Sequence, residues 1–200
     1  GPVFASSVIL NKKQENILID AGLKDSKLLS KKKRTILKTL IEENSTAWGI
    51  GQSSAKEIDR YGIRKATEFA MLRALQKLNV KPSTVYIDGI LPLRVWKGDQ
   101  KTFVKGDNKY ASIAAASVLA KVSRDSLMKR LSINFPGYYL HKNMGYGTKE
   151  HIDAIKTNFS TPIHRTSFRP VSDYMPRFKD VDDISRLSRQ IAACELVKSG

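Results

Sequence analysis

Apolar positions along this chain follow two spacings, one typical of strands and the other typical of helices. Short apolar runs predict strands over 1–10, 47–52 and 84–88, with a further short strand over 102–105. Helical periodicity predicts helices over 30–43, 55–61, 63–78, 111–133 and 148–158, with Ser30 and Thr148 as N-caps. The polar stretch after the first strand predicts a loop. Strands that alternate with helices indicate an α/β fold.

The 200 residues are enough for one domain with an appendage. Composition changes at Asp173, Pro176 interrupts the chain, and a charged amphipathic helix is predicted over 183–198. We therefore expect one domain over residues 1–172 and a helical C-terminal extension over residues 173–200.

The charge balance is strongly positive and points to an anionic partner. Lys and Arg number 35 against 19 Asp and Glu, which gives a net charge of +16. Such a field favours nucleic acid first and an anionic membrane second. The single cysteine, Cys194, excludes an internal disulfide and a cysteine-rich zinc site. The run 113–120 is too short to cross a bilayer, and no charged segment precedes a signal-like apolar run, so we expect a cytoplasmic protein without membrane contact.

Two acidic residues are candidates for metal binding. Asp88 ends an apolar strand and precedes Gly89, where α/β folds place their sites, although a turn-forming or capping Asp has the same pattern. Asp125 lies at the flank of the apolar face of the long helix, where it is also spaced to pair with Lys121 as a solvated acid. If the two acids meet, their oxygens would suit Mg²⁺ or Mn²⁺. Their spacing alone does not establish that they meet.

Other residues suggest contacts with nucleic acid. The segment 24–38 is one-sidedly basic with Asp25 as its single acid, which fits either phosphate binding or a solvated helix face. Tyr146 lies between two glycines, where it is open to stack on a base or sugar or to fill a loop. The three histidines are too far apart in sequence to indicate a metal site, and we expect structural or solvent-facing roles for His141, His151 and His164.

A series of short motifs extends over about the first 172 residues: Gly1-Pro-Val3, Leu23-Lys-Asp-Ser-Lys-Leu-Leu-Ser30, Trp48-Gly-Ile-Gly51, Glu57-Ile-Asp59, Tyr86-Ile-Asp-Gly89, Lys105-Gly-Asp107, Ser112-Ile-Ala-Ala-Ala-Ser117, Ala120-Lys-Val-Ser-Arg-Asp125, Gly145-Tyr-Gly-Thr148 and His164-Arg-Thr-Ser-Phe168. In their order and spacing, these motifs resemble the bacterial ribonuclease HII family.

The resemblance implies a ribonuclease H-like mixed β-sheet flanked by helices. It also implies an endonuclease that cleaves RNA in RNA–DNA hybrids and single ribonucleotides embedded in duplex DNA, with two Mn²⁺ or Mg²⁺ ions held by four carboxylates. Asp88 and Asp125 match two of these carboxylates, and Tyr146 matches a tyrosine that packs at the ribonucleotide–deoxynucleotide junction. Nucleic-acid contacts are expected from Lys24, Asp25, Ser26, Lys27, Lys105 and Lys121. We expect a monomer.

The sequence also departs from the family. The family signature Asp-Glu-Ala-Gly-Arg-Gly, which supplies two metal ligands and reads the ribose 2′-OH, stands upstream of Gly-Pro-Val and is absent from these residues. We therefore expect a catalytic domain without its first strand, inactive by itself. The alternative is a basic nucleic-acid-binding module without catalysis. Asn143-Met144 stands where the family usually has His-Lys, and Tyr110 stands where a small polar residue is commoner.

Overall fold

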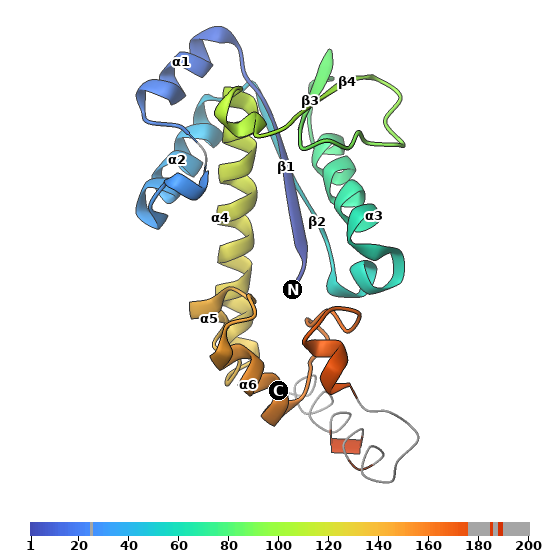
Figure 1. Ribbon diagram of the computed structural model, residues 1–200. Coiled ribbons are helices and arrows are strands. Elements are labelled where there is room, and N and C mark those ends of the chain that lie inside the picture. Colours follow the sequence, from blue (N-terminus) through green and yellow to red (C-terminus); the bar gives the residue numbers. More distant parts are fainter. Residues whose placement is uncertain (25, 176–184, 186–187, 190–200) are drawn as a thin grey trace. The chain divides into compact units, whose positions relative to one another are not determined.

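The computed structural model describes residues 1–24, 26–175, 185 and 188–189 (Figure 1). The chain divides into two compact units. We call residues 3–53 and 64–124 the sheet unit, and residues 1–2, 54–63 and 125–200 the helical unit. Helices α3 (Ala55–Gln76) and α4 (Ala111–Asn134) each contribute residues to both units.

The sheet unit contains two separate two-stranded sheets. Strand β1 (Val3–Ile9) pairs antiparallel with β2 (Ala47–Ser53), with Val3 opposite Ser53. Strand β3 (Thr84–Asp88) pairs in parallel with β4 (Asp99–Phe103), with Asp88 opposite Phe103. Both pairing directions therefore occur, as expected for a mixed α/β architecture.

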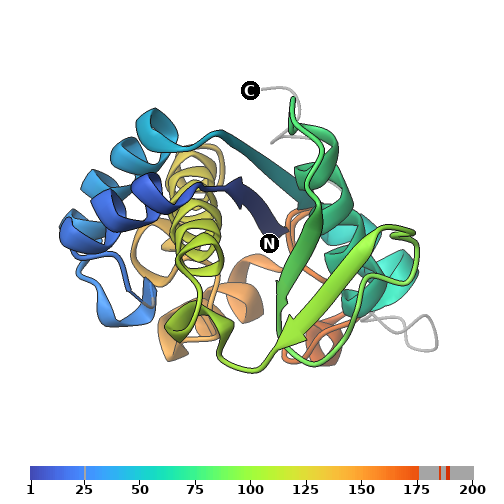
Figure 2. The ribbon, with the colours of Figure 1, turned by 90° about the horizontal axis from the view of Figure 1, so that it is seen from above.

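Helix α4 separates the first sheet from two short helices. Helices α1 (Lys12–Asp20) and α2 (Lys31–Asn44) lie on one side of α4, and β1 lies on the other side (Figure 2). A continuous apolar core joins these helices, because burial of their aliphatic side chains removes apolar surface from water. Its buried members are Leu18, Leu23, Leu29, Leu37, Ile41, Ala114, Ala115, Val118 and Leu119.

Helix α3 approaches β2 closely enough to exclude side chains between them. A Cβ atom built on Gly49 would lie 2.2 Å from the Ala74 carbonyl oxygen, and one on Gly51 would lie 2.0 Å from the Ala70 carbonyl oxygen. Glycine at both positions therefore sets the distance between strand and helix. Gly62, with φ of 78°, interrupts the helical geometry of α3 between its two predicted halves.

The helical unit is built around the end of α4. Helices α5 (Leu140–Asn143) and α6 (Lys149–Asn158) and the 3₁₀ helix η3 (Val171–Tyr174) follow it. Their shared core consists of Met128, Phe135, Tyr138, Leu140, Ala154, Ile155 and Val171. Thr148 caps α6 by accepting a hydrogen bond from the His151 amide, as predicted.

Most predicted elements are present, with three local differences. The predicted loop after β1 contains α1, which Asn11 and Gln14 stabilise through a capping box. The predicted strand over 102–105 instead runs from Asp99 to Phe103, and it cannot extend through Lys105, which adopts a left-handed conformation before the next 3₁₀ helix. The loop around Tyr146 contains the short helix α5. The predicted tail helix over 183–198 lies almost wholly outside the described residues. None of the described helices combines the length and apolarity needed to cross a lipid bilayer.

Candidate active site

Asp88 is presented at the carboxyl end of β3 with an exposed side chain. Val85 and Ile87 point into a small core with Leu93, so Tyr86 and Asp88 share the opposite, exposed face of the strand. The Asp88 Oδ1 atom accepts one hydrogen bond, 2.9 Å long, from the Gly106 amide. This is the only hydrogen bond to the carboxylate from the described residues, so most of its lone pairs remain available to a ligand.

The Gly106 amide is held in place by the turn that follows β4. Lys105 has φ of 54°, and the 3₁₀ helix η2 (Gly106–Asn108) begins directly after it. A Cβ atom on Gly106 would lie 2.6 Å from the end of the Ile113 side chain, so a larger residue here would displace that side chain. Asp107 is buried, whereas Lys105 is exposed beside the Asp88 turn. The structure thus brings Lys105 and Asp88 together through Gly106.

Asp125 lies on α4 and is half-buried. Asp125 belongs to the helical unit, whereas Asp88 belongs to the sheet unit. That the two carboxylates lie close enough to share a metal site therefore stays a prediction. Lys121, one helical turn before Asp125, is half-buried in the sheet unit. Within the described residues, no group of three or more acidic, histidine or cysteine side chains is arranged to hold a metal ion.

The basic segment divides into exposed and structural cations. Lys24, Lys27 and residues 31–33 are exposed to solvent, as a phosphate-binding surface requires. Arg34 instead donates hydrogen bonds to the Ser26 and Leu29 carbonyl oxygens, at 2.8 and 2.7 Å, and fixes the preceding turn. Asp25 lies outside the described residues.

Ser26 differs from the expectation for a groove residue. It is 4% exposed, and its hydroxyl lies 2.8 Å from the Ser117 hydroxyl on α4. This burial argues against a contact between the Ser26 side chain and nucleic acid. The side chain instead attaches the turn of the 3₁₀ helix η1 (Ser26–Leu28) to α4.

Tyr146 projects from a braced loop. Its side chain is 59% exposed, and its amide donates a 2.9 Å hydrogen bond to the Asn143 carbonyl oxygen. Asn143 is buried, donates to the Tyr138 carbonyl oxygen and accepts from the Gly145 amide. The departure from the family at Asn143 therefore supplies the side chain that holds the loop, and the loop presents the Tyr146 ring at the surface.

The histidines form no metal site among the described residues, and two of them are part of the core. His141 is exposed, whereas His151 and His164 are buried with their rings stacked and their centroids 5.4 Å apart. Burial lowers the pKa of His164 to about 3, and the neighbouring His151 contributes further. Burial also lowers the pKa of His151, although its hydrogen bond to the Tyr138 carbonyl oxygen opposes this effect. Both imidazoles are therefore neutral at physiological pH.

Sequence reasoning missed a carboxylate clamp in the helical unit. Asp59 accepts four hydrogen bonds, from the backbone amides and hydroxyls of Thr166 and Ser167. Partial burial raises the pKa of Asp59, but these hydrogen bonds outweigh it and hold the pKa below its usual value. Thr166 and Ser167 are 107 and 108 residues from Asp59 in sequence, so no local pattern predicts the contact. The only signal in the sequence was that both segments belong to motifs of the family resemblance.

Comparison with known proteins gives consistent matches. A family model described as Ribonuclease HII matches residues 1–171. The Ribonuclease HII of Prochlorococcus marinus (strain AS9601) is 56% identical over 168 residues, which cover 84% of this chain and 82% of that relative. The Ribonuclease HII of Synechococcus sp. (strain CC9311) is 54% identical, with coverage of 84% and 85%.

Solved structures show the same fold at lower identity. The ribonuclease H2 from Pyrococcus horikoshii OT3 has a TM-score of 0.71 at 22% identity and covers 90% of this chain and 100% of its own. A Bst-RNase HIII solved in complex with Mn²⁺ has a TM-score of 0.61 at 14% identity, with coverage of 87% and 64%. At these identities the likeness concerns the fold, which is ribonuclease H-like.

Proposed function

This chain belongs to the ribonuclease HII family, and we propose that it forms the catalytic domain of an endonuclease that acts on RNA–DNA hybrids and on single ribonucleotides embedded in duplex DNA. The observation that carries the proposal is the Asp88 carboxylate, which β3 exposes at its end with a single hydrogen-bond donor. A carboxylate in this position is available to coordinate a metal ion or to accept a hydrogen bond from a nucleophilic water molecule.

The chemistry of the acidic residues fits a hard divalent cation such as Mn²⁺ or Mg²⁺. Asp88 and Asp125 would hold the metal with oxygen ligands. When bound, such ions activate a water molecule and stabilise the leaving oxygen of an in-line displacement. The two acids do not make a complete site, because the described residues contain no cluster of three or more potential ligands. We propose that the carboxylates of an Asp-Glu-Ala-Gly-Arg-Gly segment complete it, and that residues 1–200 alone are inactive.

Exposed cations of the sheet unit support the nucleic-acid partner. Lys24, Lys27 and Lys105 are exposed, and each phosphate they neutralise would release counterions and strengthen binding at low salt. Lys121 is half-buried and would contribute through its ammonium group. Tyr146 would stack against the sugar or base at the junction that is cleaved. We further expect the enzyme to act as a cytoplasmic monomer.

A second candidate is a basic binding module that does not cleave. The excess of positive charge and the incomplete set of ligands among the described residues favour it. Such a module would bind hybrids and plain duplexes through the phosphate backbone and would discriminate poorly between RNA and DNA.

One pair of proteins separates the two functions. Residues 1–200 and the same chain extended upstream by a segment ending in Asp-Glu-Ala-Gly-Arg-Gly are assayed on duplex DNA with one embedded ribonucleotide, in Mg²⁺ and in Mn²⁺. We expect both to bind and only the extended chain to cleave. An extended chain that binds without cleaving would support the binding module. Cleavage by residues 1–200 that requires Asp88 would show that other acids complete the site.

A further inference from the structure

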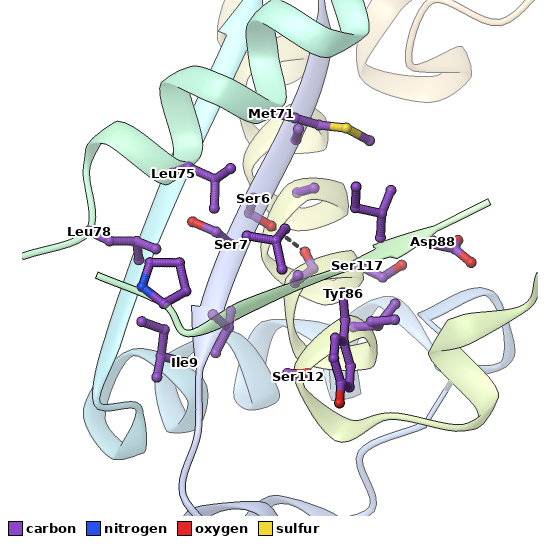
Figure 3. Close-up of a pocket in the computed structure, with 18 of the residues that line it drawn as sticks. Ser6, Ser7, Ile9, Met71, Leu75, Leu78, Tyr86, Asp88, Ser112 and Ser117 are labelled. Atoms are coloured by element: carbon purple, nitrogen blue, oxygen red, sulfur yellow. Dashed lines mark hydrogen bonds between the residues drawn. The ribbon is translucent and has the colours of Figure 1, made fainter. Parts of the chain in front are cut away.

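Asp88 and Tyr146, two of the candidate functional residues, are held in position in different ways. Asp88 ends the regular strand β3 at the border of a cavity in the sheet unit (Figure 3). Tyr146 belongs to a series of short turns in the helical unit, residues 139–147, which we call the tyrosine loop. A loop lacks the hydrogen-bond ladder that orients a strand, so the position of the Tyr146 ring depends on the contacts that hold the loop.

The tyrosine loop contains backbone conformations that residues other than glycine seldom adopt. Tyr139 and Met144, which flank α5, have φ of 55° and 52°, and Gly145 has φ of 77°. Left-handed backbone is unfavourable for a residue with a Cβ atom, and it persists only where the surrounding contacts fix it. The tyrosine loop therefore depends on contacts with residues outside it.

The Tyr138 carbonyl oxygen, directly before the tyrosine loop, accepts two hydrogen bonds. The Asn143 side-chain amide donates to it at 2.9 Å, and the Nδ1 atom of His151 lies 2.9 Å from it. A carbonyl oxygen can only accept, so Nδ1 of His151 carries the proton and donates. Tyr138, Asn143 and His151 are all buried, so the loss of one donor would not be made good by bulk water.

Asn143 connects this buried contact to Tyr146. Its side-chain oxygen accepts a 2.7 Å hydrogen bond from the Gly145 amide, and its carbonyl oxygen accepts a 2.9 Å hydrogen bond from the Tyr146 amide. The Tyr146 carbonyl oxygen accepts from the Thr148 amide at 2.8 Å, and the Thr148 hydroxyl accepts from the His151 amide. His151 therefore bonds to the residues on both sides of the tyrosine loop, through its imidazole on one side and its backbone on the other.

We propose that His151 is a positioning residue for Tyr146. Its Nδ1–H group holds the Tyr138 carbonyl oxygen and, together with Asn143, fixes the tyrosine loop in the conformation that presents the ring to nucleic acid. His151 is buried, so it acts through the loop and not by contact with the substrate. The stacking of the ring rests on the proposed function, whereas control of the loop by His151 is independent of it.

Hydrogen exchange of residues 1–200 measures the tyrosine loop directly, with the Met128 amide of the same core as the reference for global opening. His151→Leu removes the donor, and the Gly145 and Tyr146 amides should exchange about tenfold faster, as expected for one lost buried hydrogen bond. His151→Asn has a donor nitrogen the same number of bonds from Cβ as Nδ1, so exchange should stay as in the unchanged chain. His151→Gln places its nitrogen one bond farther away and should behave like His151→Leu.

His164→Leu is the matched control in the same core. His164 is similarly buried, its ring stacks on that of His151, and its Nδ1 atom accepts from the Thr161 amide, outside the tyrosine loop. The substitution should lower the melting temperature and leave the relative exchange of the Gly145 and Tyr146 amides unchanged. If His151 only fills space, the two leucine variants will show the same relative exchange.

A double-mutant cycle tests the link to stacking. Residues 1–200 are titrated with duplex DNA that contains one embedded ribonucleotide. Tyr146→Ala should raise the Kd about fivefold to 150-fold. His151→Leu should raise it about threefold or more, because a loop that presents the ring about a third of the time raises the apparent Kd by that factor. In the Tyr146→Ala background, His151→Leu should add nothing, since the two residues act as one unit.

Three results would overturn the proposal. Equal relative exchange in His151→Leu and His164→Leu would make His151 an ordinary core residue. Faster exchange in His151→Asn than in His151→Gln would show that side-chain volume matters and the Nδ1 donor does not, and this contrast decides even if His151→Leu does not fold. Additive effects of His151→Leu and Tyr146→Ala on the Kd would show that His151 acts elsewhere.

Failure of the proposed function gives a different pattern. The relative exchange would respond to His151→Leu as expected, while Tyr146→Ala would leave the Kd unchanged. In that case Tyr146 does not stack on the nucleic acid, and control of the tyrosine loop by His151 is supported.

Discussion

Asp88 at the end of β3 and Asp59 in the first turns of α3 carry the same carboxylate in opposite surroundings. Asp88 is exposed and accepts one hydrogen bond, from the Gly106 amide. Asp59 accepts four, from Thr166 and Ser167. A carboxylate has about four lone-pair positions, so Asp59 has little capacity for a ligand whereas Asp88 keeps most of its own. The number of donors therefore distinguishes a structural acid from a candidate ligand.

The largest effect is expected for Asp88→Asn in the chain extended with the Asp-Glu-Ala-Gly-Arg-Gly segment. The amide oxygen can still accept from Gly106, so stability should hold, while the loss of charge should lower turnover about a thousandfold or more. Turnover at saturating metal and the Kd for hybrid are measured. Asp99→Asn, an exposed acid of β4, serves as the control. Near-normal turnover of Asp88→Asn would show that Asp88 is not a metal ligand and that the number of hydrogen-bond donors does not distinguish it from Asp59.

Asp125→Asn should act in the same direction with a smaller effect. If Asp125 holds one of two ions, turnover should fall by about tenfold to a hundredfold, at a cost of about 1.4–2.8 kcal/mol in transition-state stabilisation. The measurement is turnover as a function of Mn²⁺ concentration, with urea unfolding to verify the fold. Full activity of Asp125→Asn would show that Asp125 is not a metal ligand and would favour the alternative, a solvated acid that pairs with Lys121.

Tyr146→Ala should weaken one class of substrate selectively. Stacking on a base is worth roughly 1–3 kcal/mol, so cleavage at a single embedded ribonucleotide should fall about fivefold to 150-fold. Cleavage within long RNA tracts should fall less. Tyr146→Phe keeps the ring and should retain activity. Equal losses on both substrates would count against a role at the junction.

Acid should destabilise the core that contains the buried imidazole of His164. The pKa of His164 is about 3 in the folded chain, below the ordinary 6.5, so the unfolded chain binds more protons between these values. Stability should be complete above about pH 6.5 and fall by up to about 1.4 kcal/mol per pH unit below it. Urea unfolding between pH 7.5 and 5 measures the slope. His164→Gln should flatten it, whereas His141→Gln at an exposed position should leave it unchanged.

Asp59→Asn should have the smallest effect, on stability alone. The amide nitrogen cannot accept from the Ser167 or Thr166 donors, so about 1 kcal/mol of unfolding free energy should be lost at this partly exposed site. The midpoint of urea unfolding measures the loss, and Asp153→Asn on the surface of α6 is the control. A large loss of turnover with unchanged stability would place Asp59 in the active site instead.

Local sequence signals predicted most of the elements, because caps and apolar periodicity act over a few residues. Ser30 and Thr148 were correctly predicted as N-caps, and the strand ending at Asp88 has the predicted bounds. Helix α1 was missed because Leu18 is its single buried residue, which leaves almost no apolar period. The start of β4 is equally weak, since its residues are mostly polar.

The tertiary contacts required the structure, because they join residues that are distant in sequence. The four donors to Asp59, the stacking of His151 on His164 and the link from Ser26 to Ser117 have no local pattern. The resemblance to ribonuclease HII correctly gave the family and the fold. It also matched the segment 25–27 to the nucleic-acid groove, which stays a prediction, and it gave no signal that the Ser26 side chain is buried against α4.

The glycines of β2 make the fold unequally tolerant of sequence change. Because the α3 carbonyl oxygens of Ala74 and Ala70 occupy the space of a side chain, even alanine at Gly49 or Gly51 requires backbone displacement. A Cβ atom on Gly147, by contrast, would meet nothing within 4 Å, and the φ of Gly147 is not positive. A library of random variants should therefore contain many folded members altered at Gly147 and almost none altered at Gly49 or Gly51, because the contact between β2 and α3 leaves no space for a side chain.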